Sequence, residues 1–278
     1  MADNNGSLTN VIGVGKKYSQ RALKETIGEP EQAATKIPAA NAEQARPAAS
    51  FGGFRYSQTR VLPVSPDILR QRRIVVGSDN DAVTVAFKTL RTKLLQTMQA
   101  RGMTTLAITS VHTGAGKTVT AVNLAVAMAM DPNHTVMLVD LDLRRPSVAA
   151  TLGWKVECGV LDHVLDGVAL PAALVHPGMG RLVVLPGRGA LSNSSELLAS
   201  PPVQRFVEEI KGKYDGRVVL FDMPAMSEGD DVLAFTPYVD GILLVVEENK
   251  TRRSEIEHAL SLLPREKILG TVLNKSKT

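Results

Sequence analysis

Short apolar runs alternate along this chain with longer segments of helical periodicity. An unbroken apolar run is typical of a strand buried on both faces, as in a parallel sheet between two layers of helices. The sequence therefore predicts an α/β fold with a doubly wound, mostly parallel sheet flanked by helices. The expected strands span residues 104–110, 135–140, 181–185, 217–222, 241–246 and 268–273, and the expected helices span 81–98, 117–130, 202–213 and 252–263.

Charge divides the 278 residues into two parts. Residues 1–75 hold eleven basic and six acidic side chains, a net charge of +5, whereas residues 76–278 hold 21 and 22, a net charge of −1. Residues 29–50 have almost no large apolar side chains, so burial cannot offset the entropy of ordering them. We therefore expect a flexible, basic, largely disordered N-terminal arm over 1–75 and a folded domain over 76–278.

Composition disfavours several classes of protein. The positive charge lies in the arm and not on the expected fold, which argues against a nucleic-acid-binding domain. The one cysteine, Cys158, cannot form an internal disulfide, and no apolar run approaches the roughly 20 residues of a membrane span. Residues 1–10 lack the layout of a signal peptide. Residues 8–27 allow two interpretations, a short amphipathic helix for a partner or lipid surface and a soluble, partly helical tail.

The strongest local motif spans residues 110–118, Ser-Val-His-Thr-Gly-Ala-Gly-Lys-Thr, which we call the phosphate loop. It follows an expected strand and opens an expected helix, the context in which a glycine-rich loop binds phosphates. Glycines allow backbone N–H groups to approach a phosphate closely, and a lysine and a hydroxyl add a cation and a Mg²⁺ ligand. The loop is a variant, because Val111 stands where the common motif has its first glycine. The expected nucleotide-binding residues are Gly114, Ala115, Gly116, Lys117 and Thr118.

Three aspartates stand at the ends of expected strands. Asp140 and Asp142 end one strand, and Asp222 ends another. In an open parallel sheet, ligands bind beyond the carboxyl ends of the strands, so we expect these carboxylates to meet Lys117 at one edge. Carboxylates there can hold Mg²⁺ or orient an attacking hydroxyl.

These motifs resemble the Walker A, A′ and B sequences of the bacterial tyrosine kinases, the cytoplasmic ATPase modules of capsular and exopolysaccharide export. The resemblance covers about residues 74–275 and is most specific in the run 140–146, Asp-Leu-Asp-Leu-Arg-Arg-Pro. It implies a P-loop NTPase of the deviant Walker A type, with ATP and Mg²⁺ as cofactors. It also implies a cytoplasmic protein that is held at the inner membrane by a transmembrane polysaccharide co-polymerase.

The resemblance assigns roles to particular residues. Lys117 would hold phosphates, and Asp142 would lie near the acceptor hydroxyl, so these two are the expected catalytic residues. Asn274 would lie near the adenine. The expected metal ligands are Thr118, Asp140, Asp142 and Asp222.

The sequence departs from the family at two places. The kinases end in a tyrosine cluster, but only Asn274 and four further residues follow the last expected strand here. The family's assembly helix carries Glu-x-x-Arg-x-x-Arg, and this chain has Val85, Lys88 and Arg91 at those positions. A ring or other homo-oligomer therefore lacks the acid of the charge-paired contact.

Three functions remain open at this point. The first is a protein-tyrosine kinase, with Tyr18 or Tyr56 of the arm as possible substrates. The second is an ATPase switch that reports its state to a co-polymerase without phosphorylating anything. The third and least favoured is a positioning ATPase of the Min/Par type, whose signature lysine is replaced here by His112.

Overall fold

The structure is a computed structural model. The expectations for residues 1–49, including the possible helix at 8–27 and Tyr18 as a substrate, concern residues that the structure does not describe, and so does the expectation for Tyr56. The described residues are 50–51, 54–55, 59–75, 82–212 and 216–276.

A central sheet of eight strands organises the described part of the chain, in the order β10-β9-β4-β8-β5-β7-β6-β3. All neighbouring strands in it are parallel except β6 and β7. A separate two-stranded sheet joins β1 to β2. The strands are β1 (Ser50–Phe51), β2 (Phe54–Arg55), β3 (Arg60–Val61), β4 (Thr105–Ser110), β5 (Thr135–Asp140), β6 (Val175–His176), β7 (Leu182–Leu185), β8 (Arg217–Asp222), β9 (Gly241–Glu247) and β10 (Ile268–Asn274).

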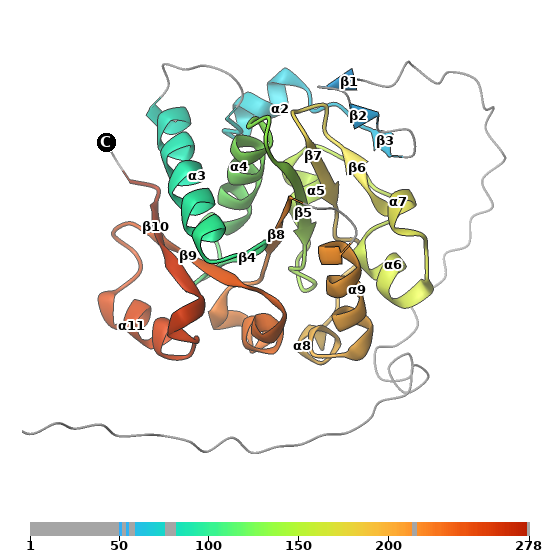
Figure 1. Cartoon of the computed structure of the whole chain (residues 1–278). Helices are drawn as coiled ribbons and strands as arrows, with labels where there is room; N and C mark the ends of the chain where they lie inside the picture. The colour runs from blue at the N-terminus through green and yellow to red at the C-terminus, as the bar shows by residue number, and fades with distance from the viewer. Residues whose placement is uncertain (1–49, 52–53, 56–58, 76–81, 213–215, 277–278) are drawn as a thin grey trace, which may run out of the picture. The chain divides into compact units, whose positions relative to one another are not determined.

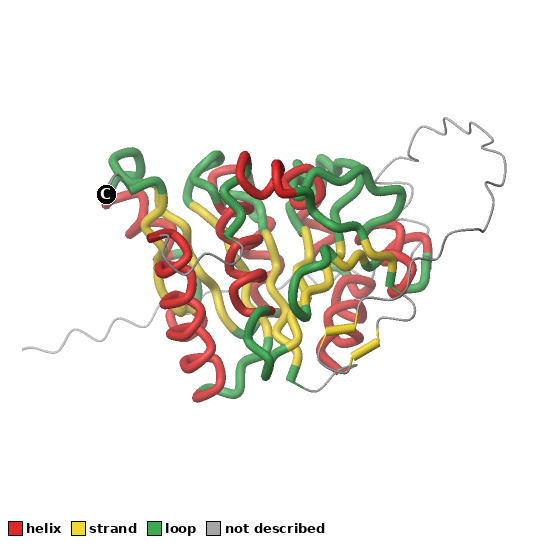
Figure 2. The backbone as a smooth tube through the Cα atoms, turned by 90° about the horizontal axis from the view of Figure 1, so that it is seen from above, coloured by secondary structure: helices red, strands yellow, loops and turns green. Residues whose placement is uncertain are grey.

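Helices lie on either side of the strands, as Figures 1 and 2 show. Short 3₁₀ turns at Met226–Glu228, Thr236–Tyr238 and Arg265–Lys267 complete the chain between them. The helices are α2 (Pro66–Gln71), α3 (Ala82–Ala100), α4 (Lys117–Ala129), α5 (Val148–Thr151), α6 (Val160–Asp166), α7 (Leu170–Ala173), α8 (Ser194–Leu198), α9 (Pro201–Gly212), α10 (Asp231–Phe235) and α11 (Arg253–Ser261).

Alternation along β9 separates the two faces of the sheet. Leu243 and Val245 belong to the large core that includes α4. Leu244 and Val246 instead pack with Ala259 of α11 in a second cluster. Successive side chains of a strand point to opposite faces, so α4 and α11 cover opposite sides. The predicted doubly wound α/β fold is thereby confirmed.

The helix α4 lies deepest in the fold. Nearly every residue from Lys117 to Ala129 is buried, and the small side chains of this alanine-rich helix let it approach strands and α3 closely. This burial fixes the start of α4, and with it the end of the phosphate loop, against the carboxyl ends of the central strands.

The predicted boundary between arm and domain at residue 75 is wrong, because residues 60–75 are part of the fold. The strand β3 pairs with the sheet edge at β6, and Ile74 is buried in the main core. The side chain of Asn123 on α4 accepts a hydrogen bond from the Val75 N–H at 2.6 Å and donates to the Arg73 carbonyl at 3.0 Å. The basic side chains of this segment obscured the burial of its few apolar ones.

None of the helices in the described ranges is both long enough and apolar enough to cross a membrane.

Candidate active site

The phosphate loop joins the end of β4 to the start of α4. Gly114 and Gly116 have φ of 77° and 94°, a left-handed conformation that glycine adopts without strain. Gly116 is the N-cap of α4, so the free N–H groups and the positive dipole end of the helix face the loop. Across the described residues, no acceptor is paired with the N–H of Ala115 or Gly116. This is the backbone arrangement that binds a phosphate.

Lys117 and Asp142 form a buried ion pair at the centre of the site. The Nζ of Lys117 lies 2.5 Å from Oδ2 of Asp142, and both side chains are almost completely buried. The other oxygen of Asp142 accepts the Arg145 N–H at 3.0 Å, which fixes the turn of the 141–147 loop. The two residues predicted to be catalytic therefore contact each other directly.

Asp222 and Thr118 form the second pair of the site. The Thr118 hydroxyl donates to Oδ2 of Asp222 at 2.6 Å. The hydroxyl of Ser147, a residue that the sequence did not single out, lies 3.0 Å from the same Thr118 oxygen. Among the described residues, the buried Oδ1 of Asp222 has no hydrogen-bond partner.

Asp140 holds the 141–147 loop in place. Its Oδ2 accepts the N–H groups of Ser147 and Val148, each at 2.9 Å, and its Oδ1 accepts that of Asp142 at 3.3 Å. The parallel register places Asp140 directly beside Asp222. Asp140 thus brings the loop that carries Asp142 up to the phosphate loop.

The electrostatics follow from three buried carboxylates around one ammonium. Burial, with repulsion from Asp222, raises the pKa of Asp140 to about 8. Burial likewise raises the pKa of Asp222 to about 6, although Lys117 and the Thr118 hydroxyl oppose the shift. Burial alone would lower the pKa of Lys117, but the surrounding carboxylates outweigh it and raise that pKa above its ordinary value.

The donor set fits a magnesium ion. A buried carboxylate oxygen without a partner, beside a hydroxyl, offers the hard oxygen ligands that Mg²⁺ prefers. No three His, Cys, Asp or Glu side chains of the described ranges are arranged to hold a metal ion by themselves. Phosphate oxygens and water would therefore have to complete the shell, as is usual for Mg²⁺ with a nucleotide.

The end of β10 contacts the phosphate loop. The Nδ2 of Asn274 donates to the Ala115 carbonyl at 2.8 Å, and the Nζ of Lys275 donates to the Gly114 carbonyl at 2.7 Å. Asn274, predicted to lie near the adenine, thus lies against the loop backbone. Lys275 was missed, although its position directly after Asn274 was a signal for it.

The side chain of His112 contacts a helix of its own chain. Its Nε2 lies 3.3 Å from Oε2 of Glu255 in the first turn of α11. That same carboxylate oxygen also accepts the Arg252 N–H at 2.7 Å. The residue at the position of the Min/Par signature lysine is therefore engaged within the chain that carries it.

A cavity of about 570 Å³ lies beside the 141–147 loop. One of its arginines, Arg144, is held by the buried carboxylate of Asp231, with Nε and Nη2 each 2.9 Å from Oδ2. Ser194 donates its hydroxyl to the other oxygen of Asp231. Sequence analysis missed this network, whose members are far apart along the chain. The cavity is lined by Arg144, Arg145, Ala190, Leu191, Ser192 and Glu228.

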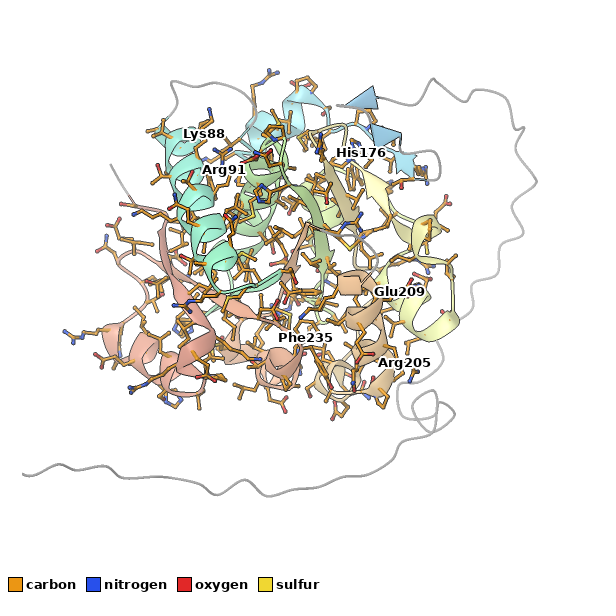
Figure 3. The ribbon with its side chains drawn as sticks, viewed as in Figure 1. Lys88, Arg91, His176, Arg205, Glu209 and Phe235 are labelled. Carbon is orange, nitrogen blue, oxygen red and sulfur yellow. The ribbon has the colours of Figure 1, made fainter. Side chains whose placement is uncertain are left out.

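The expected assembly positions lie along α3. Figure 3 shows Lys88 and Arg91 on this helix. The Nη1 of Arg91 donates to the Ala127 carbonyl of α4 at 3.1 Å, and Val85 is half exposed. Arg91 therefore supports the packing of α3 on α4.

Comparison with known proteins places this chain in a family. Residues 106–278 match the family described as the CobQ/CobB/MinD/ParA nucleotide binding domain. The match covers more than half of the chain, and the chain belongs to this family of P-loop proteins.

Individual relatives narrow the placement to one branch. The tyrosine-protein kinase CpsD of Streptococcus agalactiae is 30% identical over 61% of this chain and 74% of its own length. The kinase domain of the Escherichia coli tyrosine kinase ETK superposes with a TM-score of 0.64 at 25% identity, covering 79% of this chain and 91% of that domain. The resemblance to the bacterial tyrosine kinases is confirmed, and the chain belongs to that branch.

A longer relative matches over only part of its length. The succinoglycan biosynthesis transport protein ExoP of Rhizobium meliloti is 29% identical over 82% of this chain. The chain spans 29% of the length of ExoP.

Proposed function

We propose that this protein binds Mg-ATP and transfers its γ-phosphoryl group to a protein tyrosine in a system that makes or exports a polysaccharide. One observation carries the proposal. Lys117, Asp142, Thr118 and Asp222 converge at the edge of the sheet where the phosphate loop exposes unpaired N–H groups. Membership in the bacterial tyrosine kinase branch supports the same reaction.

The residues divide the chemistry among them. The N–H groups of Ala115 and Gly116 would cradle phosphate oxygens, and Lys117 would turn from Asp142 to the transferred phosphate. Thr118 and Asp222 would hold Mg²⁺, which supplies neutralisation of phosphate charge when it is bound. Once Lys117 has moved, the carboxylate of Asp142 is free to accept the proton of the acceptor hydroxyl.

The acceptor side would be the cavity lined by Arg144 and Arg145. It lies next to Asp142, because Arg145 donates its backbone N–H to that carboxylate. Arg144 is fixed by Asp231, whereas the side chain of Arg145 is 74% exposed and able to contact an incoming peptide.

The partner we propose is a transmembrane polysaccharide co-polymerase that brings the protein to the membrane. The name of ExoP, a biosynthesis transport protein much longer than this chain, supports this proposal. Fractionation of cells with and without the co-polymerase gene tests it. We expect the protein to pellet with membranes only when the gene is present, and equal pelleting in both strains would contradict a partner-dependent location.

Tyrosine phosphorylation of a defined acceptor tests the proposed reaction. Purified protein incubated with Mg-ATP and a synthetic Glu-Tyr copolymer should accumulate phosphotyrosine. Asp142→Asn should reduce the rate by roughly 100-fold or more, since it removes the acceptor of the proton. Nucleotide hydrolysis without any phosphotyrosine would instead favour the ATPase switch.

A further inference from the structure

The last strand of the sheet reaches the phosphate loop through two adjacent side chains. Asn274 donates to the carbonyl of Ala115, and Lys275 donates to the carbonyl of Gly114. The ammonium of Lys275 is itself held from the other side by Oε1 of Glu247, at 3.0 Å, at the end of β9. Two successive peptide groups of the loop are therefore tied to the C-terminal strands.

These hydrogen bonds to the two carbonyls also fix the directions of two N–H groups, because each peptide group is planar. In a planar trans peptide, the carbonyl and the following N–H point in opposite directions. Holding the Gly114 carbonyl toward Lys275 therefore directs the Ala115 N–H away from it. In the same way, the bond from Asn274 to Ala115 directs the N–H of Gly116. Neither of these two N–H groups has an acceptor within the described part of the chain.

The backbone at Lys275 is itself strained. Its φ is 61°, a left-handed conformation that is uncommon outside glycine and costs on the order of 1 kcal/mol. The Glu248 N–H donates to the Asn274 carbonyl at 3.0 Å, which continues the parallel pairing of β9 and β10 up to Lys275. The left-handed residue at the end of β10 thus places its side chain against the Gly114 carbonyl in spite of the conformational cost.

We propose that Lys275 is a positioning residue for the phosphates of the bound nucleotide. It acts by orienting the Gly114–Ala115 peptide of the cradle, and it does not need to touch the phosphate. The proposal rests on the proposed nucleotide-binding function and names a residue that supports it.

Competition binding tests the proposal on the full chain. A fluorescent ADP analogue with Mg²⁺ is displaced by ADP and, separately, by inorganic pyrophosphate. Because one phosphate hydrogen bond is misplaced, Lys275→Met should weaken both competitors by a similar factor of roughly five to ten. Lys275→Arg keeps a donor and should stay within about twofold of the wild type.

Lys250→Met is the matched control. The Nζ of Lys250 lies 3.2 Å from the other oxygen of Glu247, and among the described residues it forms no hydrogen bond or ion pair with the phosphate loop. Both lysine side chains are about half exposed, so folding should survive either change. Thermal unfolding of the unliganded variants checks this directly. Lys250→Met should bind both competitors as the wild type does.

Three results would overturn the proposal. Lys275→Met could bind both competitors as tightly as the wild type. It could lose ADP affinity while keeping pyrophosphate affinity, which would assign Lys275 to the nucleoside. Lys250→Met could lose as much affinity for both competitors as Lys275→Met does. The effect would then come from the lost ion pair with Glu247 and not from the contact with the phosphate loop. A wild-type protein that binds neither competitor would contradict the proposed function itself, and this inference with it.

Discussion

At the scale of single residues, the site holds more negative than positive charge. Asp140, Asp142 and Asp222 are almost completely buried around one ammonium, that of Lys117. Removing ionised carboxylates from water without full compensation is costly, and the raised pKa values of Asp140 and Asp222 express that cost. The unliganded site is therefore suited to gain a cation.

The free energy of unfolding of the unliganded protein should fall as pH rises from about 5 to about 8. The native state keeps a proton on Asp222 up to about pH 6 and on Asp140 up to about pH 8, whereas the unfolded state releases both near their ordinary pKa of 3.8. A raised native pKa means stabilisation that is fully present below pH 3.8 and is lost as pH passes the native values. Urea unfolding at pH 5, 6.5 and 8 without Mg²⁺ measures this.

Asp222→Asn should reduce the fall in the free energy of unfolding between pH 5 and pH 8 by about 1 kcal/mol or more. The substitution removes one titrating group and also the repulsion that raises the pKa of Asp140. The exposed Asp67→Asn variant should follow the wild-type slope. A wild-type stability that rises between pH 5 and pH 8 would contradict the assigned charge states.

At the scale of elements, the site depends on the contact between the end of β10 and the loop before α4. A Cβ at Gly116 would lie 2.1 Å from Nδ2 of Asn274, a distance at which something must shift. The loop and the end of the strand therefore fit together only when glycine occupies this position.

Gly116→Ala should abolish measurable ADP binding and lower the free energy of unfolding by more than the roughly 1 kcal/mol that a left-handed alanine costs. Gly102→Ala is the control, since Gly102 has a φ of 63° and open space around its Cβ position. The free energy of unfolding of Gly102→Ala should fall only by the conformational cost of a left-handed alanine, and this variant should bind ADP as the wild type does. Equal effects of the two variants on ADP binding would exclude the steric explanation.

The sequence predicted the elements of the site better than the contacts between them. Continuous apolar runs identify β4, β5 and β8, and residues at their ends converge because parallel strands end at one edge of the sheet. The contact of Lys275 with Gly114 depends instead on β10 lying two strands from β4, and strand order is not written in local periodicity. The Arg144–Asp231–Ser194 network is equally non-local.

At the scale of the whole domain, the fold begins earlier than charge and composition suggested. A capping signal was present, since Ser65 accepts the Ile68 N–H and Pro66 stands at the first position of α2. The two-residue strand β3 gave no periodicity that could reveal its pairing with β6.

Ile74→Ala should lower the free energy of unfolding by about 2–4 kcal/mol, because Ile74 is 6% exposed within the main core. Val83→Ala, at a side chain 45% exposed, should change it by less than about 0.5 kcal/mol. Denaturant unfolding of the two variants compares them. Equal free energies of unfolding of the two variants would mean that residues 60–75 belong to the arm and not to the folded domain.

Nucleotide binding by the whole molecule depends on Lys117 as the cation that holds the phosphates. The most direct test is titration of the wild type and of Lys117→Ala with a fluorescent ATP analogue and Mg²⁺, with the exposed Lys93→Ala on α3 as the control. We expect Lys93→Ala to bind as the wild type does and Lys117→Ala to lose at least about 100-fold in affinity while remaining folded. Undiminished affinity of a folded Lys117→Ala protein would contradict the site.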